Sequence, residues 1–337
     1  MRGSPRPRVH EDVVKLSGSS QRANLSGTAR RVGRLLSEPR RIVPAVRHRV
    51  AGALDRTPVV RQLTRAQRLA VITADLDLGG LGLEIGPSHN PLLAKHDGYD
   101  IRIADYLHQA GLQEKYRGVR PIERIEEVDY VLAPGRMTDS IPDRFEYIVG
   151  SHLVEHTVCL VSFLQDCEAL LQPGGVLSLA VPDKRYCFDR FRERTGIGRV
   201  IDTYRAAPAV HTEGSVLEHH LGIVRKGEQV AWSAGYPGAY RHTSTLEMAR
   251  KRAAEAAGGA YVDTHNWVFT PNHFRLLIDD LHTLGFIGLR EVSFHDTVGP
   301  EFVIALSAQG TGPGLSREEL LVLAARENTI KDELDFV

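Results

Sequence analysis

The chain has 337 residues, of which 42% are hydrophobic, and its formal net charge is zero. No run approaches the ~20 apolar residues of a membrane span, and no charged n-region followed by an apolar h-region is present, so neither a membrane-spanning nor a secreted protein is expected. Three cysteines without a C-x-x-C pair suit a reducing compartment, and we expect a cytoplasmic protein.

The zero net charge hides two regions of opposite sign. Residues 1–70 carry 16 Lys+Arg and 4 Asp+Glu, whereas the rest of the chain carries 26 and 38. Residues 1–28 are rich in Gly, Ser, Pro and Arg and are predicted to be disordered, and from residue 29 apolar residues alternate with arginines. We interpret residues 1–70 as a basic, partly disordered N-terminal extension.

Two interpretations of this extension stay open. It lies on an anionic membrane surface, which would make the protein membrane-peripheral, or it is a solvated arm that folds back on the acidic remainder. The segment lacks interleaved aromatic residues and any recognised nucleic-acid-binding motif, so nucleic acid is not expected as its partner.

The stretch Leu81–Pro91 reads as a short buried strand, Leu81 to Ile85, followed by a loop bracketed by prolines. Glu84 adds a negative charge near that loop, and Gly86 permits a ligand to approach the backbone closely. Residues 100–105 form a second predicted strand, which ends in Asp105, 19 residues after Gly86. An acid at about this spacing takes the ribose hydroxyls of nucleotide-like ligands, although a plain strand-end or capping acid is the alternative.

Further strands are predicted at residues 128–132, 144–149 and 176–181, with helices between them. This alternation predicts an α/β domain over residues 71–310, a mostly parallel sheet with helices on both faces. The pattern stops at about residues 189–262, which we interpret as an insertion that covers the ligand site, with a surface elaboration as the alternative. Its aromatic residues, Trp232, Tyr236 and Tyr240, are candidates to stack on a sugar or ring.

Two further predictions concern metal and the C-terminus. His219 and His220 are adjacent and diverge, and no second cluster has ligand spacing, so no metal site is predicted. Residues 311–337 read as a linker and a helix that opens with a capping box, Ser316 to Glu319. This helix either pairs with a partner or docks on its own domain, and the oligomeric state is left open.

The motifs LEIGPS, IADY, FEYIVGSHLVEH and LQPGGVLSLAVPDKRYCFD, between Leu81 and Asp189, together resemble the class I S-adenosylmethionine-dependent methyltransferases, in particular bacterial methyltransferase-domain proteins of the type 11-like group. The likeness resumes at residues 263–271 and ends with a strand pair near residues 287–292 and 301–306. It implies a Rossmann-like, seven-stranded, mostly parallel sheet. The likeness also implies that the cofactor is S-adenosylmethionine and that Asp105 holds its ribose. The residues implied around its methionine part and transferred methyl are Glu84, Gly86, Pro87, Ser88, Ser151 and His152.

The same resemblance implies where the methyl acceptor enters. The turn Asp183-Lys184-Arg185 would lie at the mouth of the site, and Trp267, which stands where relatives commonly have a second histidine, completes the predicted acceptor-binding set. The family also has an acidic pair near the adenine, and this chain has Leu132-Ala133 there instead.

The chemistry of methyl transfer suits these residues. Acids favour a sulfonium cation, and a hydroxyl acceptor must lose a proton to a base, for which His152 and His265 are the candidates, with structural histidines as the alternative. The predicted function is O-methylation of a glycan or secondary metabolite. A non-catalytic binding or scaffold module of the same fold is the alternative, and an NAD-dependent oxidoreductase is disfavoured because one glycine does not cradle a pyrophosphate as three do.

Overall fold

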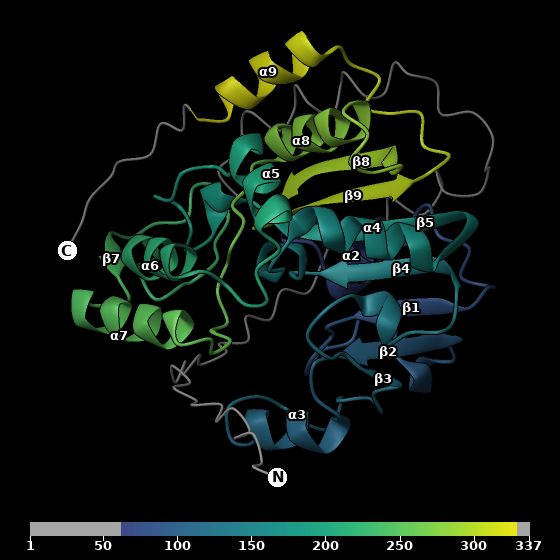
Figure 1. The fold of residues 1–337 in the computed structure, drawn as a ribbon, viewed down its shortest axis with the longest axis horizontal. Coiled ribbons are helices and arrows are strands. Elements are labelled where there is room, and N and C mark those ends of the chain that lie inside the picture. The colour runs from purple at the N-terminus through teal and green to yellow at the C-terminus, as the bar shows by residue number, and fades with distance from the viewer. Residues whose placement is uncertain (1–61, 329–337) are drawn as a thin grey trace, which may run out of the picture.

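A seven-stranded sheet forms the centre of the protein (Figure 1). The structure is a computed structural model that describes residues 62–328. The strands are β1 (Gly82–Ile85), β2 (Ile101–Asp105), β3 (Tyr130–Val131), β4 (Phe145–Ser151), β5 (Leu171–Pro182), β8 (Arg290–Val298) and β9 (Glu301–Ser307). Their order is β3-β2-β1-β4-β5-β9-β8, and β9 runs antiparallel to its two neighbours while the other pairs are parallel. The predicted mostly parallel α/β sheet is therefore confirmed.

One strand differs in length from the sequence-based expectation. Strand β5 begins at Leu171 rather than at Val176, because Leu171 pairs with Phe145 of β4 before a register shift, after which Val176 pairs with Tyr147. The connection from β1 to β2 contains a 3-10 turn, Lys95–Asp97, in place of an α-helix. Its backbone N–H groups therefore need acceptors from elsewhere in the chain.

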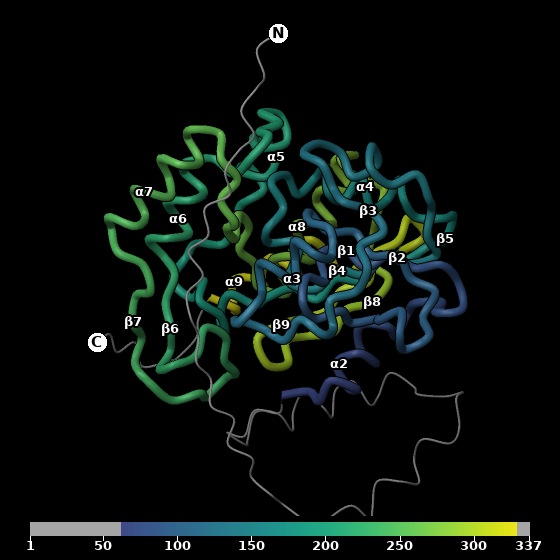
Figure 2. The backbone as a smooth tube through the Cα atoms, turned by 90° about the horizontal axis from the view of Figure 1, so that it is seen from below, coloured from purple at the N-terminus to yellow at the C-terminus, as the bar shows by residue number. Residues whose placement is uncertain are grey.

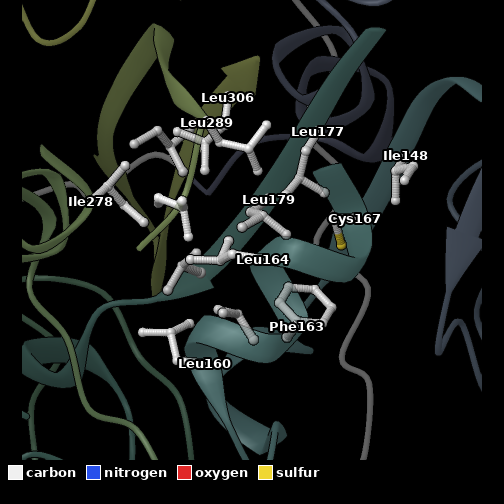
Figure 3. Packing of buried hydrophobic residues seen from close by; sticks show 14 of the residues in the cluster. Ile148, Leu160, Phe163, Leu164, Cys167, Leu177, Leu179, Ile278, Leu289 and Leu306 are labelled. Carbon is white, nitrogen blue, oxygen red and sulfur yellow. The ribbon is translucent and has the colours of Figure 1, made fainter. Parts of the chain in front are cut away.

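Helices cover both faces of the sheet, as predicted. On one face, α4 (Leu160–Leu170) and α8 (Pro271–Thr283) pack against apolar side chains of the sheet. Leu164 and Cys167 of α4 lie over the sheet near Leu179, as Figure 3 shows. On the other face, α2 (Arg65–Ile72) packs with the residues that follow β1. Together these layers make the carboxyl edge of the parallel strands a rigid rim.

Most of the predicted insertion forms a lobe beside that rim, with α6 (Glu213–Gly222), β6 (Val224–Lys226), β7 (Tyr240–His242) and α7 (Leu246–Ala257). Its first helix, α5 (Ile197–Ala206), instead packs against α4 and buries Val200 in the main core. Figures 1 and 2 show α6, α7 and the β6–β7 pair to one side of the sheet, and β4 points toward them. Trp232 and Tyr240 are buried in a small core of the lobe, with Tyr186, Phe191 and Tyr236 around them. Burial thus removes Trp232 and Tyr240 from the predicted stacking on a sugar.

The C-terminal helix, α9 (Arg317–Arg326), docks on its own domain. The predicted capping box is present, since Glu319 N–H donates to Ser316 Oγ at 3.2 Å and Ser316 N–H donates to Glu319 Oε2 at 2.7 Å. Arg317 Nε donates to Asp280 Oδ1 of α8 at 2.7 Å, and Leu320 is buried. Of the two alternatives for this helix, the structure supports docking.

The basic extension falls almost wholly outside the described residues, and the predictions of disorder and of membrane contact concern residues 1–61, which lie there. Within residues 62–328, no helix combines the length and the apolar content that crossing a membrane requires. One further helix, α3 (Gln109–Tyr116), follows β2 and contributes Tyr116 to the site described next.

Candidate functional site

Three predicted cofactor residues lie in one row at the carboxyl edge of the sheet. Ile85 of β1 is in register with Ala104 of β2 and with Gly150 of β4. The residues that come next in each strand, Gly86, Asp105 and Ser151, therefore stand side by side. The strand order changes direction between β1 and β4, and ligands of open α/β sheets bind outside such a point.

The loop after β1 bends sharply over this row. Gly86 has φ +65°, and a Cβ there would lie 3.1 Å from Leu153 Cδ1, so both conformation and space favour glycine. After Pro87, Ser88 has φ 57° and its N–H donates to Asp105 Oδ2 at 3.1 Å. Ser88 Oγ also donates to the hydroxyl of Tyr116 at 2.6 Å, which attaches the loop to α3.

Asp105 is buried at the end of β2, and it accepts a second hydrogen bond from the N–H of Tyr106 at 2.8 Å. Burial raises the pKa of its carboxyl above the ordinary value, although these backbone donors oppose the shift. A ligand that brings hydroxyl donors or positive charge to this edge would therefore stabilise the charged carboxylate.

Glu84 points away from this row. Its carboxylate accepts hydrogen bonds from the N–H groups of Leu92 at 2.8 Å and Leu93 at 3.0 Å. Glu84 thus satisfies two backbone donors of the connection between β1 and β2. The side chain is fully buried, and burial raises its pKa to about 7 despite these two donors. This arrangement lends no support to the predicted contact of Glu84 with the cofactor ammonium.

His152 is held at the end of β4 in a left-handed backbone conformation, with φ 51°. Its Nε2 lies 2.7 Å from Glu301 Oε2, and its side chain is 40% exposed. Arg68 of α2 donates to Glu301 Oε2 at 2.8 Å and to Ser151 Oγ at 2.6 Å. Burial alone would lower the pKa of His152, but the bond with Glu301 outweighs burial and raises this pKa above its ordinary value. Burial alone would raise the pKa of Glu301, but His152 and Arg68 lower it to about 2.

The second candidate base, His265, is buried under the insertion. Its Nδ1 lies 2.5 Å from Asp189 Oδ2, and Arg192 donates to the other oxygen of Asp189 at 2.6 Å. His265 Nε2 is 3.9 Å from Glu155 Oε1, and His152 Nδ1 is 3.8 Å from the same oxygen. The structure therefore gathers both predicted bases around Glu155.

The predicted acceptor-binding residues are engaged within the protein. Arg185 forms a two-pronged ion pair with the buried Asp183, with Nε–Oδ1 and Nη2–Oδ2 distances of 2.9 Å and 2.6 Å. Lys184 Nζ donates to the backbone oxygen of Arg190 at 3.0 Å. Trp267 is 1% exposed and its Nε1–H donates to Thr157 O at 2.6 Å, which places it in the core and leaves the predicted acceptor contact without support.

Three residues of this region were not identified from the sequence. Arg68 belongs to a helix that precedes the recognised motifs, and Glu301 begins the antiparallel strand β9. Glu155 stands next to His156 shortly after a predicted strand, and this adjacency of an acid and a histidine was a usable signal. All three carry charge to the carboxyl edge of the sheet.

Comparison with known proteins gave structural matches only. No family model matches the chain, and no curated protein sequence matches it either. The CcbJ methyltransferase from Streptomyces caelestis is 12% identical over 74% of this chain and 99% of that one, with a TM-score of 0.37. The mitomycin 7-O-methyltransferase MmcR is 13% identical over 71% of this chain, with a TM-score of 0.34, and the match spans 53% of its length. A protein of Rhodobacter sphaeroides, provisionally assigned as a Zn-dependent alcohol dehydrogenase, is 12% identical over 74% of this chain and 91% of that one, with a TM-score of 0.39.

Proposed function

We propose that this chain binds S-adenosylmethionine at the row formed by Gly86, Asp105 and Ser151, and transfers its methyl group to a hydroxyl of a glycan or secondary metabolite. The observation that carries the proposal is the alignment of this row at the point where the strand order reverses, with a buried carboxylate whose charged form favours hydroxyl or cationic ligands. The motifs of the sequence add the family resemblance.

In this proposal, different residues contact different parts of the cofactor. Gly86, Pro87 and Ser88 form the wall beside the methionine part, and Asp105 accepts the ribose hydroxyls once the loop at Ser88 yields its bond. When bound, S-adenosylmethionine supplies an electrophilic methyl group on a sulfonium. Holding the acceptor oxygen in line with that methyl is the main contribution that binding residues make to such a reaction.

His152 is the better candidate for the base that takes the acceptor's proton. A carboxylate only accepts hydrogen bonds, so the proton on Nε2 is donated to Glu301 and Nδ1 is left unprotonated in the neutral ring. Glu301 acts as a positioning residue for the ring. His265 is enclosed by Asp189 and Glu155, which makes it a less accessible base.

One observation favours the non-catalytic alternative. Glu84 and Asp105 both have their hydrogen bonds satisfied inside the protein, as a binding module without a nucleotide cofactor would require. Titration calorimetry with S-adenosylmethionine, S-adenosylhomocysteine and NAD separates the candidates. We expect binding of the first two alone; binding of none supports the scaffold, and binding of NAD contradicts methyl transfer.

A further inference from the structure

Three side chains converge beneath the insertion, outside the proposed cofactor row. Glu155 and His156 come from the 3-10 turn Val154–His156 that follows β4, and His265 comes from the segment after the insertion. One ligand atom from each lies within 4.8 Å of the others. The Nε2 atoms of His156 and His265 are each 3.9 Å from Glu155 Oε1.

Each of the two histidines has a carboxylate behind it. His156 Nδ1 lies 2.8 Å from Asp263 Oδ1, and His265 Nδ1 lies 2.5 Å from Asp189 Oδ2. Because a carboxylate only accepts, the ring proton is on Nδ1 in both cases, and in the neutral rings Nε2 presents its lone pair to Glu155. Metal-binding histidines use this arrangement, in which an outer carboxylate fixes the tautomer and the ring orientation.

Glu155 is buried among imidazoles, since His152 Nδ1 lies 3.8 Å from Oε1 in addition to the Nε2 atoms of His156 and His265 at 3.9 Å. Its side chain is 0% exposed, and within residues 62–328 neither carboxylate oxygen has a hydrogen-bond partner. A buried carboxylate that accepts no hydrogen bond is costly. The 3.9 Å distances to the two imidazoles exceed hydrogen-bond length, but they approach the roughly 3.4 Å between two ligand atoms on one tetrahedral ion with bonds of about 2.1 Å.

We propose that Glu155, His156 and His265 bind a divalent first-row transition metal ion, of which Zn²⁺ is the representative. Two imidazoles and one carboxylate suit Zn²⁺, Fe²⁺ or Mn²⁺, whereas Ca²⁺ and Mg²⁺ favour oxygen ligands alone. The proposed site differs from the sequence-based expectation of no metal, because residues from positions 155–156 and 265 meet only in the folded chain. It does not depend on the proposed methyl transfer.

The ion would join the two ends of the insertion to the sheet. Asp189 stands where the insertion begins, and Asp263 and His265 stand where it ends, while Glu155 and His156 follow β4 directly. A metal at this point therefore holds the base of the lobe against the carboxyl edge. Removal of the ion is expected to lower the stability of the lobe more than that of the sheet.

The test is a Zn²⁺ titration of the full-length protein after removal of metal, in competition with a chromophoric chelator. We expect one strongly bound Zn²⁺ per chain. His156→Ala and His265→Ala should each weaken this binding at least a hundredfold, and Asp263→Asn, which alters an outer carboxylate, about 10–100-fold. The matched control is His96→Ala, because His96 also bonds a carboxylate, Glu126, at 2.5 Å but is exposed and belongs to no group of three converging metal-ligating side chains among the described residues.

Two results would overturn the site. One is the absence of strong Zn²⁺ binding by the unaltered protein, and the other is Zn²⁺ binding by His156→Ala and His265→Ala that is as strong as that of the unaltered protein. Circular dichroism confirms that each variant is folded. X-ray absorption of the Zn²⁺-loaded unaltered protein decides the case even if the variants misfold. Nitrogen and oxygen neighbours at about 2.0–2.2 Å are expected, and a sulfur neighbour at about 2.3 Å would place the ion elsewhere.

Discussion

Glu301 and His152 are 149 positions apart in the chain, yet Glu301 Oε2 lies 2.7 Å from His152 Nε2. The antiparallel direction of β9 makes this contact possible. It brings the first residue of β9, rather than its last, to the edge where β4 ends. The bond orients the ring that we propose as the base, and the following predictions begin from it.

His152→Ala should lower methyl transfer by about 10²–10⁴-fold and leave S-adenosylhomocysteine affinity within about twofold, since a base acts on the acceptor's proton. Glu301→Gln should also lower the rate, but by less, because the ring remains present. Both are measured as product release with an acceptor that the unaltered protein methylates. His96→Ala, which alters an exposed histidine of the 3-10 turn Lys95–Asp97, is the control. A His152→Ala variant with full activity would exclude His152 as the base.

The backbone at His152 predicts an unusual order of stability. At φ 51° an L-residue other than glycine is strained by roughly 1–2 kcal/mol. His152→Gly should therefore have a free energy of unfolding about 1 kcal/mol higher than His152→Ala, although both variants lose the bond to Glu301. Denaturant unfolding of this pair measures the difference. If the alanine variant were the more stable, the strain would not be real.

Asp105→Ala should weaken binding of S-adenosylhomocysteine by about 1–3 kcal/mol if the carboxylate holds the ribose. The measurement is titration calorimetry, with circular dichroism to verify folding. Asp100→Asn serves as the control because Asp100 is an exposed acid next to the amino end of the same strand, β2. Unchanged affinity in a folded Asp105→Ala variant would remove this residue from the cofactor site.

Glu84 predicts a pH dependence of stability. The folded protein holds the proton on Glu84 up to a pKa of about 7, whereas the unfolded chain releases it near 4.5. Between these values the folded state binds more protons, so this group's contribution to the free energy of unfolding falls as pH rises, by on the order of 3 kcal/mol in all.

In Glu84→Gln this position does not titrate, so its contribution to the free energy of unfolding does not fall as pH rises. The glutamine retains an oxygen that can accept from the N–H groups of Leu92 and Leu93. The stability of Glu84→Gln minus that of the unaltered protein should therefore increase from pH 4.5 to about pH 7 and be constant above that range. Urea unfolding at a series of pH values provides the measurement. A difference that stays constant across this range would contradict the raised pKa.

The sheet was largely predictable because its signals are local. Runs such as Phe145–Ser151 combine apolar content with a turn at their end, and Pro271 and the Ser316–Glu319 pair mark helix starts by their own chemistry. The register that aligns Gly86, Asp105 and Ser151 follows from parallel pairing of such strands, and the strand-end positions of these residues already indicated a shared edge.

The charged partners were not predictable from local signals. The contacts of His152 with Glu301 and of His265 with Asp189 join residues 149 and 76 positions apart, and no spacing rule connects them. Glu84 was assigned to the ligand because strand-end acids commonly face one. The connection after β1 has no α-helix at Leu92 and Leu93, so the N–H groups of these residues lack helical acceptors. The Glu84 carboxylate points inward and accepts their hydrogen bonds instead.

The bond between Asp189 and His265 holds the two ends of the lobe close together. A segment of more than seventy residues leaves the domain and returns to nearly the same point, where the two side chains meet at 2.5 Å. Segments whose ends lie close together can be lengthened, shortened or exchanged without altering the strand order of their host. The residues between Asp189 and His265 can therefore vary in length while the strands beneath them keep their order.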